Sequence, residues 1–234
     1  MQYKTDALLL RAVDYGENDK IVTLLTADMG KIGAGVKGVK KAGAKLRFAA
    51  QPFCFAEYVL AERGGRYTAT GASLYDGFYS VTESVETYYA AAAVCEACDK
   101  LVFEGMDAKA PLLFAVNALK ELSAGKGAAA LIGFLLKLLA SAGYPVGVEN
   151  CPKCGKELNG RMRFDFASGA FFCDGCGIGE PASENTYLTL RRIAGLSGET
   201  SADGEKRALR LLYTYFFYQT DLELNALKEY VKLV

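Results

Sequence analysis

Residues 151–177 read CPKCGKELNGRMRFDFASGAFFCDGCG, and this stretch decides how the whole chain is organised. Each CxxC turn brings two sulfur atoms to the same side, and the glycine that follows relieves crowding in the turn. Two such turns, with eighteen residues between Cys154 and Cys173, have the spacing of a four-cysteine zinc ribbon. We therefore predict one Zn2+ ion per chain, with the ligands Cys151, Cys154, Cys173 and Cys176.

The ion is expected to be structural, because four protein ligands leave no open position for water or substrate. Between the two turns, residues 161–166 and 170–172 have the pattern of a hairpin that turns at Ser168 and Gly169. Disulfide bonds are the competing interpretation. However, the seven cysteines are an odd number, and nothing at the amino terminus resembles a secretory signal. Reduced thiols in a cytoplasmic protein are the better expectation.

Composition indicates a globular protein of two or three domains, since 51% of the 234 residues are hydrophobic. The most apolar run, residues 128–140, is interrupted by Lys137 and is shorter than the roughly 20 residues that cross a bilayer. We expect no membrane segment.

The chain contains no histidine. This removes the commonest general base at neutral pH and excludes nucleophile pairs and metal sites that need an imidazole. Acidic residues are scattered, without the paired arrangement that carboxylate catalysis requires. The sequence therefore favours binding over catalysis, and we expect no enzymatic activity.

Five short apolar runs separated by turn signals occupy the amino-terminal part of the chain. They predict a small five-stranded β-barrel of the oligonucleotide-binding (OB) type. Gly33, Gly35 and Gly38 within the third run suggest places where a barrel strand bends sharply. The runs are residues 7–13, 21–25, 31–39, 53–60 and 67–74.

The same glycines spell GxGxxG, with Glu57 at the distance of a ribose-binding acid in a dinucleotide fold. That motif should end a strand and open a helix within a βαβ unit. Here a Lys/Gly/Ala stretch and then Gln51-Pro52 follow, so we reject a dinucleotide site.

Residues 31–47 carry six cations and no acid, although the chain as a whole has no net charge. On an OB barrel, such a strand and loop would line the groove that follows a nucleic-acid backbone, with aromatic rings as stacking platforms. The simpler alternative is a solvated loop. The candidate DNA-binding residues are Lys31, Lys37, Lys40, Lys41, Lys45 and Arg47, with Tyr15, Phe48 and Tyr67 as candidates for stacking.

The opening ALLLRAVDYGENDKIVTLLTADMGKIGAGVKGVKK and the later QPFCFAEYVL resemble the bacterial recombination mediator family RecO. The resemblance continues through the middle of the chain to a cysteine module placed as in zinc-containing members. It implies a cytoplasmic, nucleoid-associated protein that binds and anneals single-stranded DNA without turnover. It also implies partnership with RecR and single-stranded DNA-binding protein during RecA loading. Whether double-stranded DNA binds stays open.

Ser80-Val81-Thr82-Glu83 reads as a capping box that opens a long helix, so a domain boundary is expected near Tyr79. Further helices are expected over residues 108–123, from Gly127 to about Gly143, from the cap Ser183 to Gly195, from Glu205, and from Leu222. The predicted fold is α+β and multidomain. It comprises an OB domain (1–79) and a helical domain (80–234) into which the zinc ribbon (148–180) is inserted.

Cys95 and Cys98 form a third CxxC, which raises the possibility of a redox dithiol. They lie inside an alanine-rich helix rather than at a strand-to-helix turn, so packed thiols are favoured, as for Cys54. A second basic set is either a solvated helix face, a dock for an acidic partner, or an extension of the DNA-binding surface. Its members are Arg191, Arg192, Lys206, Arg207 and Arg210.

Two functions of other classes remain as alternatives. A zinc-ribbon adaptor would hold proteins together, and its lysines would only keep it soluble. A nuclease would need a carboxylate pair with Mg2+. DNA binding that weakens with salt would favour the mediator, whereas a stable protein partner without DNA binding would favour the adaptor.

Overall fold

The computed structural model describes residues 2–177 and 179–234. These form two compact units, Met1–Ala124 and Gly125–Val234. The OB barrel and the helices α1 and α2 belong to the first unit, and the cysteine module and helices α3 to α6 belong to the second. The expected boundary near Tyr79, between a barrel and a helical domain, stays a prediction.

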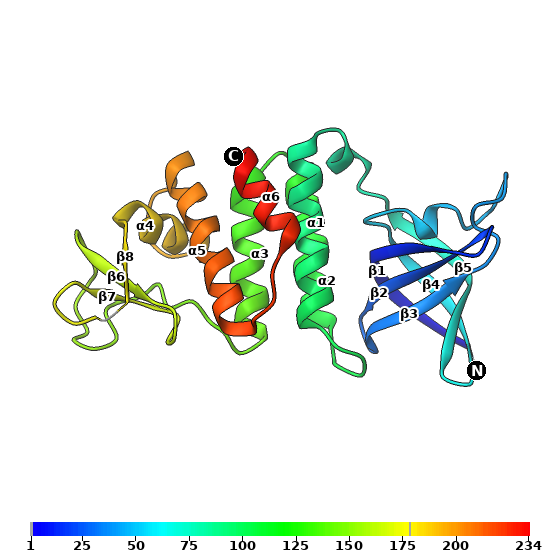
Figure 1. Cartoon of the computed structure of the whole chain (residues 1–234), viewed down its shortest axis with the longest axis horizontal. Helices are drawn as coiled ribbons and strands as arrows, with labels where there is room; N and C mark the ends of the chain where they lie inside the picture. Colours follow the sequence, from blue (N-terminus) through cyan, green and yellow to red (C-terminus); the bar gives the residue numbers. More distant parts are fainter. Residues whose placement is uncertain (1, 178) are drawn as a thin grey trace. The chain divides into compact units, whose positions relative to one another are not determined.

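The predicted barrel is confirmed. Its strands close in the order β1-β2-β3-β5-β4, with every pair antiparallel except β3 and β5, which run parallel (Figure 1). Inward-facing side chains such as Leu9, Val22, Leu24 and Tyr58 form its core. The strands are β1 Gln2–Tyr15, β2 Asp19–Thr26, β3 Gly30–Val36, β4 Phe55–Arg63 and β5 Arg66–Asp76.

Between β3 and β4 an extended loop contains only a short 3-10 helix, η1 (Phe48–Ala50). No helix follows the three glycines of GxGxxG, which agrees with the rejection of a dinucleotide site. Figure 1 shows this loop beside the β1–β2 turn, at the end of the barrel. Lys40 N donates to the carbonyl of Asn18, and Gly38 N donates to Asp19 Oδ1, so the loop is fixed to that turn.

The first helix begins later than the capping box predicted. Residues 79–82 form a 3-10 turn, η2 (Tyr79–Thr82), and α1 (Val85–Leu101) is capped by Ser84, whose Oγ accepts from Thr87 N at 3.0 Å. Ser80 and Ser84 are both of a residue type that caps helices. Ser80 lies within η2, however, and Ser84 has the extended backbone that an N-cap needs. α2 (Lys109–Ser123) follows as expected.

The second unit begins with α3 (Gly127–Ser141). α4 (Glu184–Ile193) is capped by Ser183 as predicted, whereas α5 (Ala202–Thr220) begins three residues early because Ser201 caps it, and α6 is Asn225–Leu233. The predicted hairpin is present as β6 (Met162–Asp165) and β7 (Ala170–Cys173). A third strand, β8 (Glu180–Ala182), pairs with β6 and was not predicted.

An aromatic core joins the cysteine module to its helices. Phe164 lies 4.8 Å from Phe171 and 5.6 Å from Tyr215, measured between ring centroids, and Phe171 lies 5.2 Å from Tyr187. All four rings are buried. Tyr187 comes from α4 and Tyr215 from α5, so both helices pack against the module. No helix in the described part of the chain has the length and apolarity to span a membrane.

Candidate metal centre and nucleic-acid interface

The four cysteines of the two CxxC turns meet at one point. Their sulfur atoms all lie within 4.8 Å of one another, and Cys154 Sγ and Cys173 Sγ are 3.8 Å apart. A tetrahedral ion with metal–sulfur bonds of about 2.3 Å separates its ligands by roughly 3.8 Å. The geometry and the four thiol donors therefore fit a bound metal ion.

The two glycines that follow the turns are required for different reasons. Gly155 has φ +72°, a left-handed conformation that lets its N–H donate to the carbonyl of Cys151 at 2.8 Å. Gly177 has no positive φ, but a side chain there would come within 2.4 Å of Phe172 Cβ. The first glycine forms the turn, and the second lets the turn lie against β7.

The local electrostatics favour the thiolate form of Cys151 and oppose that of Cys173. Desolvation opposes ionisation of Cys151, but N–H groups of the two turns lower its pKa to about 6. The pKa of Cys173 is raised to about 12 by its hydrogen bond with Cys176, by desolvation and by the other cysteines. A bound cation offsets this conflict, because its positive charge stabilises the thiolate form of all four cysteines.

Arg191 holds the segment that leads into the module. Its Nη1 donates to the carbonyl of Val148 at 3.0 Å and to Tyr187 Oη at 2.9 Å, and its Nε donates to the carbonyl of Ser197. Tyr187 in turn donates to the carbonyl of Glu149 at 2.6 Å. Arg191 therefore has a structural role within its own unit.

The other members of the second basic set differ in their surroundings. Arg207 pairs with Asp203 at 2.7 Å, while Arg192 and Arg210 are exposed and Lys206 is half-buried. Arg207 and Arg210 line a hollow of about 270 Å³ beside β8 and Phe166. A role for these residues toward DNA or a partner stays a prediction.

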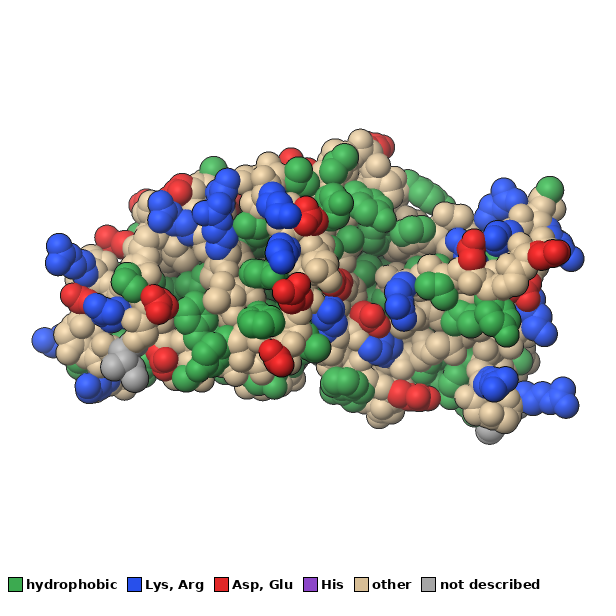
Figure 2. All heavy atoms as spheres, viewed as in Figure 1, with side chains coloured by type: hydrophobic (Ala, Val, Ile, Leu, Met, Phe, Trp, Pro, Cys, Tyr) green, Lys and Arg blue, Asp and Glu red, His purple; other side chains and the backbone are tan. Residues whose placement is uncertain are grey.

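The cations of the loop after β3 are exposed at the end of the barrel. Lys37, Lys41 and Lys45 have no ion-pair partner among the described residues, whereas Lys40 pairs with Asp14 at 2.8 Å. Arg47 is also exposed and donates to the carbonyl of Lys41. At the far right of Figure 2, Lys and Arg side chains gather at this end of the barrel, with acidic side chains between them.

Two hollows flank the loop. The larger, of about 560 Å³, lies at the β1–β2 turn and is lined by Tyr15, Glu17, Lys37 and Lys41 among others. The smaller, of about 370 Å³, is lined by Lys20, Val39, Lys40, Arg47, Ala50 and Gln51. Asp14 lies near both lysines of the smaller hollow, since its carboxylate is also 4.0 Å from Lys20 Nζ.

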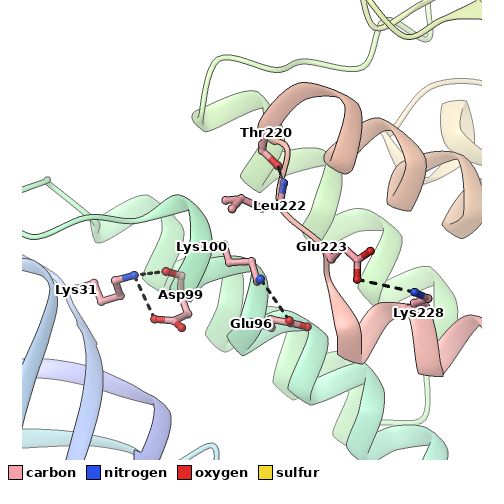
Figure 3. A network of polar contacts seen from close by, with 8 residues as sticks. All are labelled: Lys31, Glu96, Asp99, Lys100, Thr220, Leu222, Glu223 and Lys228. Carbon is pink, nitrogen blue, oxygen red and sulfur yellow. Dashed lines mark hydrogen bonds and ion pairs between the residues drawn. The ribbon is translucent and has the colours of Figure 1, made fainter.

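Lys31 is separated from the other predicted cations, since it lies near the start of β3 and they follow the end of that strand. Its Nζ bonds to the carboxylate of Asp99 at 3.2 Å and to the carbonyl of the same residue (Figure 3). It also lies 5.8 Å from the centre of the Phe103 ring. Lys31 thus ties the barrel to the end of α1.

The three candidate stacking rings differ in exposure. Tyr15 is 62% exposed at the β1–β2 turn. Tyr67 and Phe48 are partly buried and pack on the barrel core, and Tyr67 also has its ring 6.2 Å from that of Tyr3. Of the three, Tyr15 offers the freest face to a base.

Sequence reasoning missed Arg11, Lys20 and Asp14 as neighbours of this surface. Arg11 is an isolated charge in an apolar strand, and Asp14 and Lys20 lie in the polar segment around the β1–β2 turn, so no local pattern distinguishes them. Strand register does: Arg11 lies opposite Thr23, and Asp14 lies opposite Lys20.

The three cysteines outside the module, Cys54, Cys95 and Cys98, are buried as predicted. Desolvation raises the pKa of each of these thiols. A raised pKa keeps a thiol protonated at neutral pH, which does not suit redox chemistry.

The fold and the site define a class of protein in which an OB-type barrel with an exposed basic loop shares a chain with helices that carry a four-cysteine metal module. Two family profiles match, "Recombination protein O N terminal" over residues 1–78 and "Recombination protein O C terminal" over residues 82–230. The chain therefore belongs to the RecO family of DNA repair proteins.

Curated relatives agree along nearly the whole chain. A DNA repair protein RecO from Myxococcus xanthus is 33% identical over 83% of this chain and 80% of its own length. The protein of the same name from a Nocardioides species is 30% identical over 97% of this chain and 98% of its own length. That of Shouchella clausii is 29% identical, covering 97% and 93%.

Proposed function

We propose that this protein is a non-enzymatic mediator that binds single-stranded DNA through its barrel and anneals complementary strands. It helps to load RecA together with RecR and single-stranded DNA-binding protein, as in the family it belongs to. The site residues are the cations of the loop after β3, with Tyr15 and Tyr67 toward bases. Lys31 is the least suited of the predicted DNA-binding residues, because it already forms an ion pair with Asp99.

One observation carries the proposal. Lys37, Lys41 and Lys45 are exposed on a single loop and have no acidic partner within the described residues. Exposed lysines that are not paired internally keep their attraction for an external anion. Spread along a loop at the end of an OB barrel, they suit the repeating phosphates of a nucleic acid better than a single small anion.

The test is a salt titration of labelled oligothymidylate binding. For the double variant Lys37→Ala, Lys41→Ala we expect weaker binding, and a slope of log K against log salt that is less steep by about 1.4, or about 0.7 for each phosphate that is no longer neutralised. The control variant Lys120→Ala, Lys137→Ala removes the same charge from exposed positions on α2 and α3. If both variants bind like the wild type, the proposed face is wrong.

We also propose that the metal ion is Zn2+ and that it is structural. The support is the four-thiolate ligand set, which suits zinc and leaves no open coordination position. When bound, the ion would supply folding energy to the module. The mediator function then needs no chemistry at the metal.

The adaptor alternative makes the opposite prediction for DNA. A protein that only joins other proteins would bind oligothymidylate weakly, and the Lys37→Ala, Lys41→Ala variant would not differ from the control. The exposed, unpaired lysines favour the mediator over this alternative.

A further inference from the structure

Cys154 differs from the other cysteines of the chain in its exposure. The structure describes all seven, and Cys154 is the one that is exposed, while Cys173 and Cys176 are half-buried. Cys151, the remaining cysteine of the module, is only 1% exposed. A fully enclosed metal site would bury all four of its cysteines. This site is therefore open to solvent at Cys154.

Cys173 lies next to the exposed cysteine, on the other CxxC turn. The two sulfur atoms are 3.8 Å apart and would have to approach to about 2 Å to form a disulfide bond. The turns have room for this movement, because a side chain added at Gly155 or Gly175 would meet no atom within 4 Å. Lys153 also joins the two turns, since its Nζ donates to the carbonyl of Cys176 at 3.1 Å.

An accessible thiolate beside a second thiolate is the arrangement that peroxides oxidise reversibly. A bound metal ion keeps its cysteine ligands in the thiolate form, which is the form that reacts. Cys54, Cys95 and Cys98 are buried and lie outside the module, so neither condition holds for them. The exposed side of the module is thus the place in the described chain where an oxidant would react first.

We propose that the cysteine module is a site of reversible oxidation, at which hydrogen peroxide joins Cys154 to Cys173 by a disulfide bond and the metal ion is released. The Cys154 thiolate attacks one peroxide oxygen, so that a sulfenic acid forms and hydroxide leaves. The Cys173 thiolate then attacks the sulfenic sulfur, forms the S–S bond and displaces a second hydroxide.

The electrons and atoms balance in this sequence. The two sulfur atoms lose two electrons, and the peroxide takes them up and becomes two molecules of water with two protons from the solvent. Cys151 and Cys176 remain as two thiolate ligands, which do not complete a tetrahedral site, so the ion dissociates.

The remaining contacts explain why the change is reversible. The rings of Phe164 and Phe171 pack on Tyr215 and Tyr187, and none of these contacts involves a sulfur atom. The aromatic core and the new disulfide bond therefore keep the two turns close together after the ion has left. Reduction of the disulfide bond by a thiol restores the four ligands.

This inference rests on the proposed Zn2+ ion, and its test begins with the zinc-loaded protein. Hydrogen peroxide is added, the released ion is followed with a chromogenic chelator, and the remaining free thiols are counted with a thiol reagent. We expect about one ion to be released for roughly every two thiols lost. Dithiothreitol together with added Zn2+ should restore both the thiols and the bound ion.

Peptide mapping identifies the cysteines that react. Trypsin cleaves after Lys153 and so places Cys151 and Cys154 in different peptides. Mass spectrometry of the oxidised protein should show residues 154–156 linked to residues 164–191, and fragmentation should assign the link to Cys173 rather than Cys176. Dimedone, which traps sulfenic acids, should label Cys154 when it is present during the oxidation.

The same map contains its own control. Cys54 lies in the tryptic peptide 48–63, and Cys95 and Cys98 lie in the peptide 67–100. All three cysteines are buried, so we expect their peptides to stay unmodified while the module is oxidised.

The outcomes are distinguishable. Release of the ion together with a link from Cys154 to Cys173 supports the inference. Retention of the ion in peroxide overturns it, and so does a disulfide bond between any other two cysteines or equally fast oxidation of the three buried cysteines. A protein that holds no metal before oxidation overturns the proposed Zn2+ ion as well. None of these results bears on DNA binding, because the loop after β3 belongs to the other compact unit.

Discussion

Asp14 shows how one acidic residue changes the ability of a basic surface to bind an anion. Its carboxylate accepts a hydrogen bond from Lys40 at 2.8 Å and lies 4.0 Å from Lys20. The hydrogen bond from Lys40 lowers the pKa of Asp14, so the carboxyl is ionised at neutral pH. A phosphate that approaches Lys40 must therefore displace an anion that is already present.

We predict that Asp14→Asn binds single-stranded DNA about two- to fivefold more tightly than the wild type, since exposed ion pairs are weak and easily exchanged. The salt slope should become steeper, because Lys40 no longer exchanges one anion for another. Fluorescence titrations at several salt concentrations measure both quantities. Asp28→Asn is the control, because Asp28 pairs with Lys109 instead. Equal affinity in Asp14→Asn and wild type would contradict this prediction.

Sequence alone could indicate which stretch is basic but not which cations are free. Lys40 and its partner Asp14 are 26 positions apart, and Lys31 and Asp99 are 68 positions apart. These pairs form through strand register and through the packing of α1 on the barrel, and neither leaves a local pattern. The four cysteines could be predicted because their spacing itself encodes the turns that gather them.

Among the elements, the cysteine module depends most on its ligands. It contains three short strands, and its aromatic core is shared with α4 and α5. Strands of three or four residues have little stability of their own, so a bound ion must supply much of the folding energy.

We predict that Cys176→Ser lowers the metal content from about one ion per chain to near zero, measured by elemental analysis. The Tm should fall as well, followed by circular dichroism. Cys98→Ala is the control, because Cys98 is buried in α1, within the other compact unit. In the wild type, acidification should also release the ion, because protons compete with the metal for the four thiolates. Full metal content in Cys176→Ser would contradict the ligand assignment.

The elements that sequence predicted well are those with a strong periodic pattern, namely the five barrel strands and the helices α2, α3 and α4. Helix starts were less certain wherever two cap residues stand close together, as at Ser80 and Ser84. β8 has only three residues and contains Pro181, so it carries no strand signal. It forms because Arg163 and Phe164 of β6 offer it a free edge.

For the molecule as a whole, the barrel is joined to α1 and α2 in one compact unit. Leu8 and Leu25 lie opposite each other on β1 and β2 and are fully buried, although neither belongs to the barrel's own core. α1 packs on these two strands, and Cys95 Sγ lies 3.8 Å from the carbonyl oxygen of Leu9. The helix therefore completes the barrel's burial.

We predict that a fragment of residues 1–124 unfolds cooperatively, whereas a fragment of residues 1–79 aggregates or melts without a clear transition. Without α1, the shorter fragment would expose Leu8 and Leu25 to water. Thermal unfolding followed by circular dichroism, together with size-exclusion chromatography, compares the two. A shorter fragment as stable as the longer one would show that the OB barrel is an independent domain.

Lys31 gives this unit a further property. Because the same ammonium group satisfies the end of α1 and the carboxylate of Asp99, neutralising it would loosen the protein before any ligand is present. If the charged residues of the barrel were substituted one at a time, a folding defect at Lys31 would then be mistaken for the loss of a DNA contact. Only substitutions of the cations beyond the end of β3 would measure how charge contributes to DNA binding.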